Sequence, residues 1–183
     1  MSFEDIKIID NKYYMPVFNR ADVCFTHGKG CKLYDINNKE YLDFGAGIAV
    51  NCLGHNNPDL VNAISKQAKN IIHLSNLYYS PVQAECAKEL IQGTDFDKVF
   101  FCNSGAEANE GAIKLVRKYY YNLGVNKPVI ITAKNSFHGR TLATAAATGQ
   151  SKYSDPYAPL PEKFIHVPFN DIEAITEAIT DET

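Results

Sequence analysis

Hydrophobic and polar residues follow two different rhythms along this chain, and the change falls near Gly54. Before Gly54, short β-prone runs are separated by turn sequences, which predicts a small antiparallel meander. After it, long amphipathic helices alternate with short continuous apolar runs, a pattern typical of parallel strands joined by crossover helices. We therefore expect an α/β protein in which residues 1–54 form an N-terminal α+β segment and residues 55–183 begin a larger α/β domain.

The same pattern predicts individual elements. We expect strands over 23–27, 31–35 and 40–44, and then over 99–102, 129–133 and 164–167. Helices should begin at Asn57-Pro58, at Ser80-Pro81, near Ala106, at Leu142 and after Asn170, whose spacing to Glu173 fits a capping box. The first two helices should bury their apolar residues, which are Leu60, Val61, Ile64, Ala68 and Ile71 in one and Val82, Cys86, Leu90 and Ile91 in the other. Three parallel strands form a thin sheet with unpaired edges, so we expect the sequence to be part of a larger protein.

Composition excludes several classes of function. The 18 basic and 21 acidic residues give a net charge of −3, without the basic face that nucleic acids or anionic membranes require. The 5 cysteines are scattered, with no metal-ligand spacing, which favours reduced, mostly buried thiols and no metal site. The N-terminal MSFEDIKIIDNKYY resembles neither a secretory signal nor a membrane span. We therefore expect a soluble, cytoplasmic protein.

A first candidate motif is FCNSGAEANEGAIK, at residues 101–114, where an apolar run leads through small residues into a helix. Such a junction directs backbone NH groups and the positive end of the helix dipole at one point, where a phosphate can bind. Gly105 and Ala106 leave room for a ligand to approach the backbone, and Ser104 adds a hydroxyl. The same pattern also fits a plain strand-to-helix connection, and acidic residues such as Glu110 are favoured in first turns whatever the function.

A second candidate motif is NSFHGRT, at residues 135–141, which follows another apolar run. Phe137 would stack on a planar ring or serve as a core aromatic. Arg140 would hold a carboxylate through two hydrogen bonds or form a surface ion pair. His138 fits a solvated turn, a cofactor contact or packing equally well. Together the two motifs indicate a pocket for a flat, phosphorylated cofactor and an acidic substrate.

Several ordered motifs resemble one known family. NSGAEANEGAIKLVRKY, ITAKNSFHGRT and ATGQ, with YMPVFNR, GKGCKLYDINNKEYLDFGAGIAVNCLGHNNP and HLSNLYYSPVQAECAKEL upstream, are similar to the class III pyridoxal-phosphate aminotransferases of fold type I, and most closely to the acetylornithine aminotransferases among them. The resemblance covers nearly the whole chain. It implies a three-layer αβα large domain, here incomplete, preceded by part of a small domain.

The resemblance also implies roles for individual residues. Ser104, Gly105 and Ala106 match positions that hold the phosphate of pyridoxal 5'-phosphate, and Phe137 matches the aromatic that stacks on its ring. We count His138 among the cofactor-binding residues as well. Glu110 matches a position near the cofactor. Arg140 matches the arginine that binds the substrate α-carboxylate, and Tyr14 matches a residue at the substrate entrance.

The implied reaction moves the δ-amino group of N-acetylornithine to 2-oxoglutarate, giving glutamate, by a ping-pong mechanism in arginine biosynthesis. The implied assembly is a homodimer with shared active sites. The lysine that binds the cofactor as a Schiff base has no counterpart in this sequence, so we expect no catalytic residue here and no activity from these residues alone.

Other interpretations stay open. Ornithine and 4-aminobutyrate aminotransferases are possible relatives, since much of what selects the amine lies elsewhere. A nucleotide or phosphosugar module is a second alternative, although GxGxxG and GxxxxGK[ST] are absent. A non-catalytic dimerisation fragment is a third.

Overall fold

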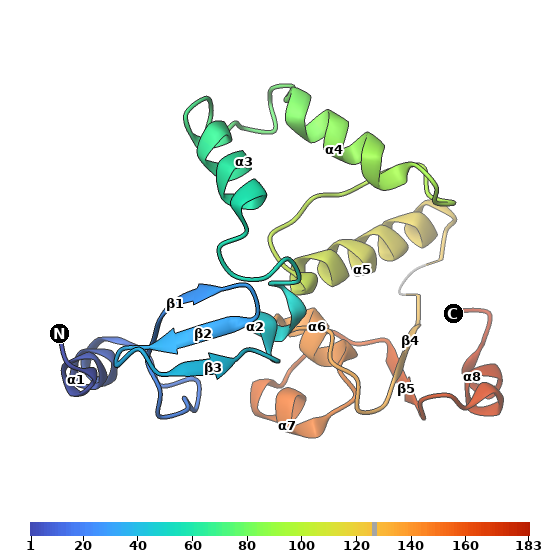
Figure 1. Cartoon of the computed structure of the whole chain (residues 1–183). Helices are drawn as coiled ribbons and strands as arrows, with labels where there is room; N and C mark the ends of the chain where they lie inside the picture. Colours follow the sequence, from blue (N-terminus) through green and yellow to red (C-terminus); the bar gives the residue numbers. More distant parts are fainter. Residues whose placement is uncertain (126–127) are drawn as a thin grey trace. The chain divides into compact units, whose positions relative to one another are not determined.

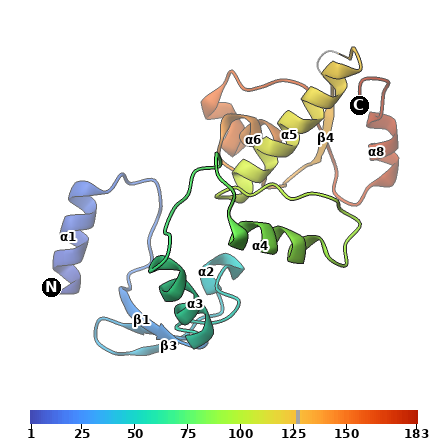
Figure 2. The same ribbon diagram turned by 90° about the horizontal axis from the view of Figure 1, so that it is seen from above.

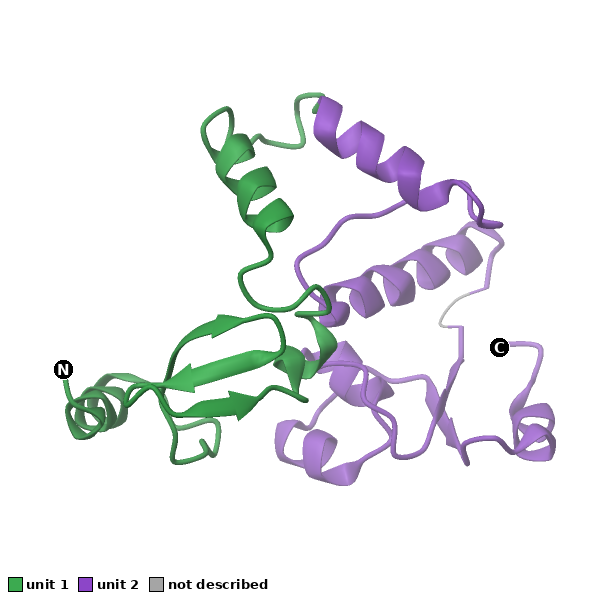
Figure 3. Cartoon of the chain, in the orientation of Figure 1, with its two compact units in different colours: residues 1–80 green, residues 81–183 purple. Residues whose placement is uncertain are grey.

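The structure, a computed structural model, describes residues 1–125 and 128–183. It contains two compact units, Met1–Ser80 and Pro81–Thr183, which Figure 3 colours green and purple. The division into domains after Gly54 stays a prediction about the complete fold.

The first unit begins with α1 (Phe3–Tyr13), which is capped by Ser2 and Asp5 in a reciprocal capping box. The expected meander then follows as an antiparallel sheet of order β1-β2-β3 (Figure 1). Its strands are β1 (Phe25–Lys29), β2 (Lys32–Asp35) and β3 (Glu40–Leu42). The meander predicted from the sequence is therefore confirmed, with strand ends shifted by one or two residues.

One buried carboxylate closes the turn between β2 and β3. Asp35 is 8% exposed and accepts hydrogen bonds from the backbone NH groups of Asn37 and Lys39 and from the hydroxyl of Tyr41. These bonds favour the charged form, with the Lys39 amide contributing most, and hold the pKa of Asp35 below its usual value. A second carboxylate, Asp43, accepts a 2.7 Å bond from His55 and orders the loop that contains the short α2 (Ala46–Ala49).

Two amphipathic helices begin where the sequence predicts. Asn57 caps α3 (Pro58–Ala68) through bonds from Asp59 and Leu60, and α4 (Pro81–Ile91) begins at its proline. The expectation that their apolar faces are buried is wrong for this chain: of the nine residues named for them, Ile91 is half-buried and the others are exposed. The helical spacing identifies the apolar face, but it does not identify what covers that face.

The second unit is built around α5 (Gly105–Asn122), α6 (Leu142–Ala147) and a two-stranded parallel sheet. The sheet pairs β4 (Ile130–Ala133) with β5 (Phe164–Val167) in register. Figures 1 and 2 show α6 beside α5, and α6 also packs on β5. The remaining elements are α7 (Ser151–Ser154), the 3-10 helix η1 (Asp155–Tyr157) and α8 (Ile172–Ala178).

The core of this unit is made largely of small side chains. Buried residues are Ala143 and Ala145–Ala147 on α6, Ile113 on α5, and Val129 and Val167 at the strands. Thr144 and Thr148 are 0% and 1% exposed. The small residues of α6 allow the backbones of neighbouring segments to pack closely against this helix.

Two expectations about this unit, and one about the cysteines of both units, are wrong. The predicted strand at 99–102 is irregular, so the described sheet has two strands and not three, because β structure requires a neighbouring strand to pair with. The cap of α8 is Asp171, which accepts from Ala174, because Asn170 adopts φ +60°. The thiols are free, as expected, but only Cys24 is partly buried; the other four are exposed.

Candidate active site

The first motif forms the beginning of α5. Ser104 is its N-cap, with an extended backbone, and its Oγ accepts a 3.2 Å bond from the NH of Glu107. The Glu107 carboxylate accepts a 2.6 Å hydrogen bond from the NH of Asn103, and this bond fixes the segment that leads into the helix. The NH groups of Gly105 and Ala106 stand in the first turn, where an α-helix provides no internal partner. A Cβ added at Gly105 would meet no described atom within 4 Å, so the turn is open on that side.

The second motif is the loop that follows β4. Its start is fixed by backbone bonds from Lys134 to Val167 at 2.6 Å and from Asn135 to Gly149 at 2.9 Å. Asn135 adopts φ +59°, which turns the chain away from the strand. The loop then runs through residues 136–140 to Thr141, which is the N-cap of α6. Because β4 is parallel to β5, this loop lies at the carboxyl edge of the sheet, the edge where α/β proteins bind ligands.

Three contacts join the two motifs. Gly139 adopts φ +136°, and a Cβ there would lie 2.7 Å from Cβ of Ala106, so the loop backbone touches the first turn of α5. Asn109 Nδ2 donates a 2.8 Å bond to the carbonyl of His138. Thr141 Oγ1 donates to the carboxylate of Glu110. The phosphate-binding candidate and the loop of aromatic and basic residues therefore form one site.

Helix α6 holds the same loop from the other side. Thr148 Oγ1 accepts from the NH of His138 at 3.0 Å, and Thr144 Oγ1 accepts from the NH of Thr141 at 3.0 Å. Both threonines are almost completely buried, so these bonds are shielded from competing water. The loop is thus fixed at its peptide groups, while the side chains of Phe137 and Arg140 are exposed.

The exposed side chains of the loop lie together. The guanidinium carbon of Arg140 lies 5.8 Å from the ring centre of Phe137 and 4.8 Å from that of Tyr153. The two rings meet edge to face, with centres 6.0 Å apart. Phe137 is 58% exposed, so one of its faces can receive a planar group.

His138 has a different environment from its neighbours. Its Nε2 atom is buried and has no hydrogen-bond partner among the described residues, and the same holds for Oγ of Ser136. Both residues line a cavity of about 820 Å³ with residues of β4 and with Pro168 and Phe169. Nearby, burial lowers the pKa of His166, and the proximity of His138 lowers it further.

These residues fit a flat, phosphorylated group. The open first turn of α5 supplies NH donors and the Ser104 hydroxyl for a phosphate, Phe137 supplies an aromatic face, and Arg140 supplies a cation. The orphaned polar atoms of His138 and Ser136 are further groups that a ligand would satisfy. Tyr14 belongs to the other compact unit, where its ring lies 4.4 Å from the guanidinium of Arg20, and its role at the substrate entrance stays a prediction.

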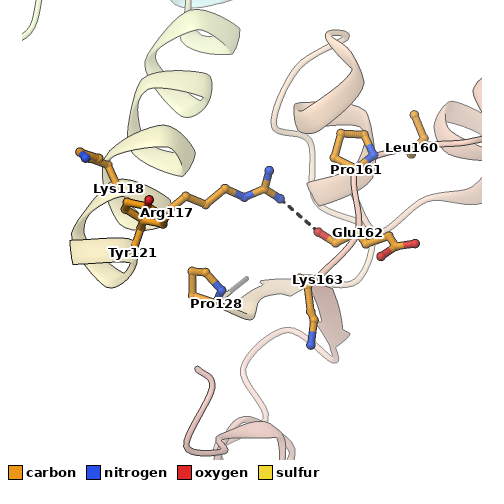
Figure 4. A pocket seen from close by; sticks show the side chains of 8 residues that line it. All are labelled: Arg117, Lys118, Tyr121, Pro128, Leu160, Pro161, Glu162 and Lys163. Carbon is orange, nitrogen blue, oxygen red and sulfur yellow. Dashed lines mark hydrogen bonds between the residues drawn. The ribbon is translucent and has the colours of Figure 1, made fainter. Parts of the chain in front are cut away.

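Another cavity, of about 590 Å³, lies at the far end of α5 and is lined by no residue of the two candidate motifs, 101–114 and 135–141 (Figure 4). There Arg117 points from α5 toward the segment before β5 and donates a 3.1 Å bond to the carbonyl of Glu162. Within residues 1–125 and 128–183, no group of three side chains is arranged to bind a metal ion. In the same part of the chain, no helix has the length and apolar character that crossing a membrane requires.

Comparison with known proteins identifies the family of this chain. Residues 14–182 match the aminotransferase class-III family. This chain belongs to the class III aminotransferases. The acetylornithine aminotransferase of Methanocaldococcus jannaschii is 53% identical over 184 residues, a match that covers 100% of this chain and 46% of that protein. The chain therefore spans about half the length of the curated relatives it matches.

Solved structures of the family have the same fold. An ornithine aminotransferase from Toxoplasma gondii, with partial occupancy of PLP at its active site, matches with a TM-score of 0.92 and 27% identity over 97% of this chain and 42% of its own. The N-acetylornithine aminotransferase of Stenotrophomonas maltophilia K279a is 39% identical, with a TM-score of 0.69, over 90% of this chain and 38% of its own. The expected fold of a type I aminotransferase is confirmed for the part that the chain spans.

Three residues of the site have no role in the sequence-based prediction, although Asn109 and Thr141 lie within its two motifs. Asn109 carried a usable signal, because asparagine is unfavourable inside a helix and its presence there suggests a tertiary contact. Thr141 carried one as well, as a candidate N-cap. Tyr153 carried none: its importance comes only from its position beside Phe137 and Arg140.

Proposed function

We propose that these residues form the cofactor-phosphate and substrate-carboxylate part of a pyridoxal-phosphate-dependent acetylornithine aminotransferase. The protein would move the δ-amino group of N-acetylornithine to 2-oxoglutarate and release glutamate. The observation that carries the proposal is the direct contact between the first turn of α5 and the loop of Phe137 and Arg140, at Gly139 and Ala106. The similarity to proteins named acetylornithine aminotransferase supports the choice of substrate.

Each residue has a defined task in this proposal. The NH groups of Gly105 and Ala106 and the hydroxyl of Ser104 bind the phosphate, because the helix dipole and unpaired donors favour an anion there. Phe137 covers one face of the cofactor ring, and His138 and Glu110 lie beside the cofactor. When bound, pyridoxal phosphate supplies an electron-withdrawing ring that accepts and returns an amino group.

Arg140 binds the α-carboxylate of the amine donor and then a carboxylate of 2-oxoglutarate. A planar guanidinium suits both, because each presents a carboxylate that it can hold through two parallel hydrogen bonds. Tyr14 lines the approach of the substrate. In this proposal the lysine that carries the cofactor lies outside these 183 residues, so these residues alone are inactive. The intact protein is a homodimer in which the two subunits share their active sites. The cytoplasm is the location we predict for it.

An amino-transfer assay tests the proposal. The intact protein that contains this sequence is incubated with pyridoxal phosphate, 2-oxoglutarate and one amine donor, and glutamate is measured. We expect N-acetylornithine to give a higher kcat/KM than ornithine or 4-aminobutyrate. A preference for either of those would change the substrate but keep the reaction. No cofactor-dependent glutamate from any of the three donors would contradict the proposed function.

A further inference from the structure

Tyr153 connects the two exposed side chains of the candidate site. It lies on α7, is half-buried, and contacts the guanidinium of Arg140 and the ring of Phe137 at once. Its helix is tied to the loop, since Gln150 Nε2 donates a 2.8 Å bond to the carbonyl of Ser136 and the NH of Tyr153 donates to Gln150. The position of this ring is therefore fixed relative to the loop.

Arg140 has an unusual set of neighbours for an arginine. In the part of the chain that the structure describes, no carboxylate lies within ion-pair distance of it. Its described contacts are instead with two aromatic rings, and the closer ring is Tyr153. An aromatic ring interacts with the face of a guanidinium and leaves the NH groups at its edge free for a carboxylate.

We propose that Tyr153 is a positioning residue that holds Arg140 ready to bind the substrate carboxylate. The proposal rests on the proposed function of Arg140. An arginine side chain loses conformational entropy when it is immobilised. If the side chain is mobile before the substrate binds, this entropy loss lowers the affinity for the substrate. Contact with Tyr153 restricts the side chain in advance, without the competition that a neighbouring carboxylate would bring. Both substrates use the same guanidinium, so Tyr153 affects both.

The ring of Tyr153, and not its hydroxyl, makes this contact. The informative variants are therefore one that keeps the ring and one that removes it. Tyr153→Phe keeps the ring, and Tyr153→Leu removes it. Tyr157→Leu is the matched control, because Tyr157 is a neighbouring tyrosine on η1 that is 61% exposed. Arg140→Ala provides the reference for complete loss of the guanidinium.

Two measurements are made on the intact protein. The first is steady-state kinetics, with KM determined for the amine donor and for 2-oxoglutarate. The second is calorimetric titration of 2-oxoglutarate into the cofactor-free protein, which requires no turnover. We expect Tyr153→Leu to raise both KM values and the Kd of 2-oxoglutarate roughly 2- to 30-fold, the range of a cation–π contact. Cofactor absorbance should be retained, Tyr153→Phe should stay within about twofold of wild type, and Tyr157→Leu should show no change.

The outcomes separate this proposal from the proposed function. If Arg140→Ala raises both KM values but Tyr153→Leu does not, the role of Tyr153 is overturned and the function stands. If Arg140→Ala has no effect, the carboxylate site itself is wrong. If Tyr153→Leu does not fold, stepwise fluorination of a phenylalanine at position 153 keeps the ring shape while weakening its negative face. KM should then rise with each fluorine, and a constant KM would overturn the proposal.

Discussion

Replacing Gly139 by alanine should separate the two halves of the candidate site. Gly139 adopts φ +136°, a conformation that residues with a Cβ rarely adopt. The new Cβ would also lie 2.6 Å from Oγ1 of Thr144 and 2.7 Å from Cβ of Ala106. Thr144 is buried on α6 and Ala106 lies in the first turn of α5, so moving either atom away would cost free energy. Backbone strain of about 1–3 kcal/mol and overpacking of about 1–3 kcal/mol together predict a loss of about 2–6 kcal/mol.

The assay is urea unfolding of the cofactor-free intact protein, followed by far-ultraviolet circular dichroism. A lower midpoint with an unchanged slope would report lost stability. Gly124→Ala is the control for strain alone, since Gly124 has φ +82° but nothing within 4 Å of an added Cβ. It should cost about 1–2 kcal/mol.

A second control tests the site without disturbing the fold. Gly105→Ala meets open space, so we expect a stability change below about 1 kcal/mol. It places a methyl group on the turn proposed for the phosphate, so pyridoxal phosphate should bind more weakly. The reasoning is refuted if Gly139→Ala costs no more than Gly124→Ala, because the contact between the loop and α5 would then be absent.

Three further changes have defined outcomes. Arg140→Ala in the intact protein should raise KM for both substrates while the cofactor stays bound; loss of the cofactor would contradict that role. Asn109→Ala leaves the His138 carbonyl without its donor and should cost about 1–3 kcal/mol in urea unfolding, whereas Asn122→Ala, on the same helix, should not. Because the pKa of His166 is lowered in the folded protein, this side chain is protonated in the unfolded chain before it is protonated in the folded one as pH falls below about 6.5. Stability should therefore decline with acidification, and less steeply in His166→Gln; identical slopes would count against the burial of His166.

Local features of the fold could be predicted from the sequence because their causes are local. The meander follows from short β-prone runs and turn residues, and α3 begins at Asn57-Pro58 because the cap needs only the next few residues. The strand expected at 99–102 fails for the opposite reason. A strand depends on a partner, and apolar residues alone do not supply one.

The candidate site shows the same limit. Residues 104–106 and 137–140 could be proposed from the sequence because small, aromatic and basic residues after predicted strands carry chemical meaning, and the family resemblance implies their roles. The contact of Gly139 with Ala106 joins residues far apart in sequence, and neither residue indicates the other. Tyr153 is a further example, since only the folded chain places it against Arg140.

A crystal structure of the intact protein grown with pyridoxal phosphate tests the central claim most directly. We predict the phosphate within about 2.7–3.2 Å of the NH groups of Gly105 and Ala106, with the ring against Phe137 and the guanidinium of Arg140 facing the substrate side. A cofactor bound by other residues, with the first turn of α5 empty in a complete and folded protein, would contradict the account.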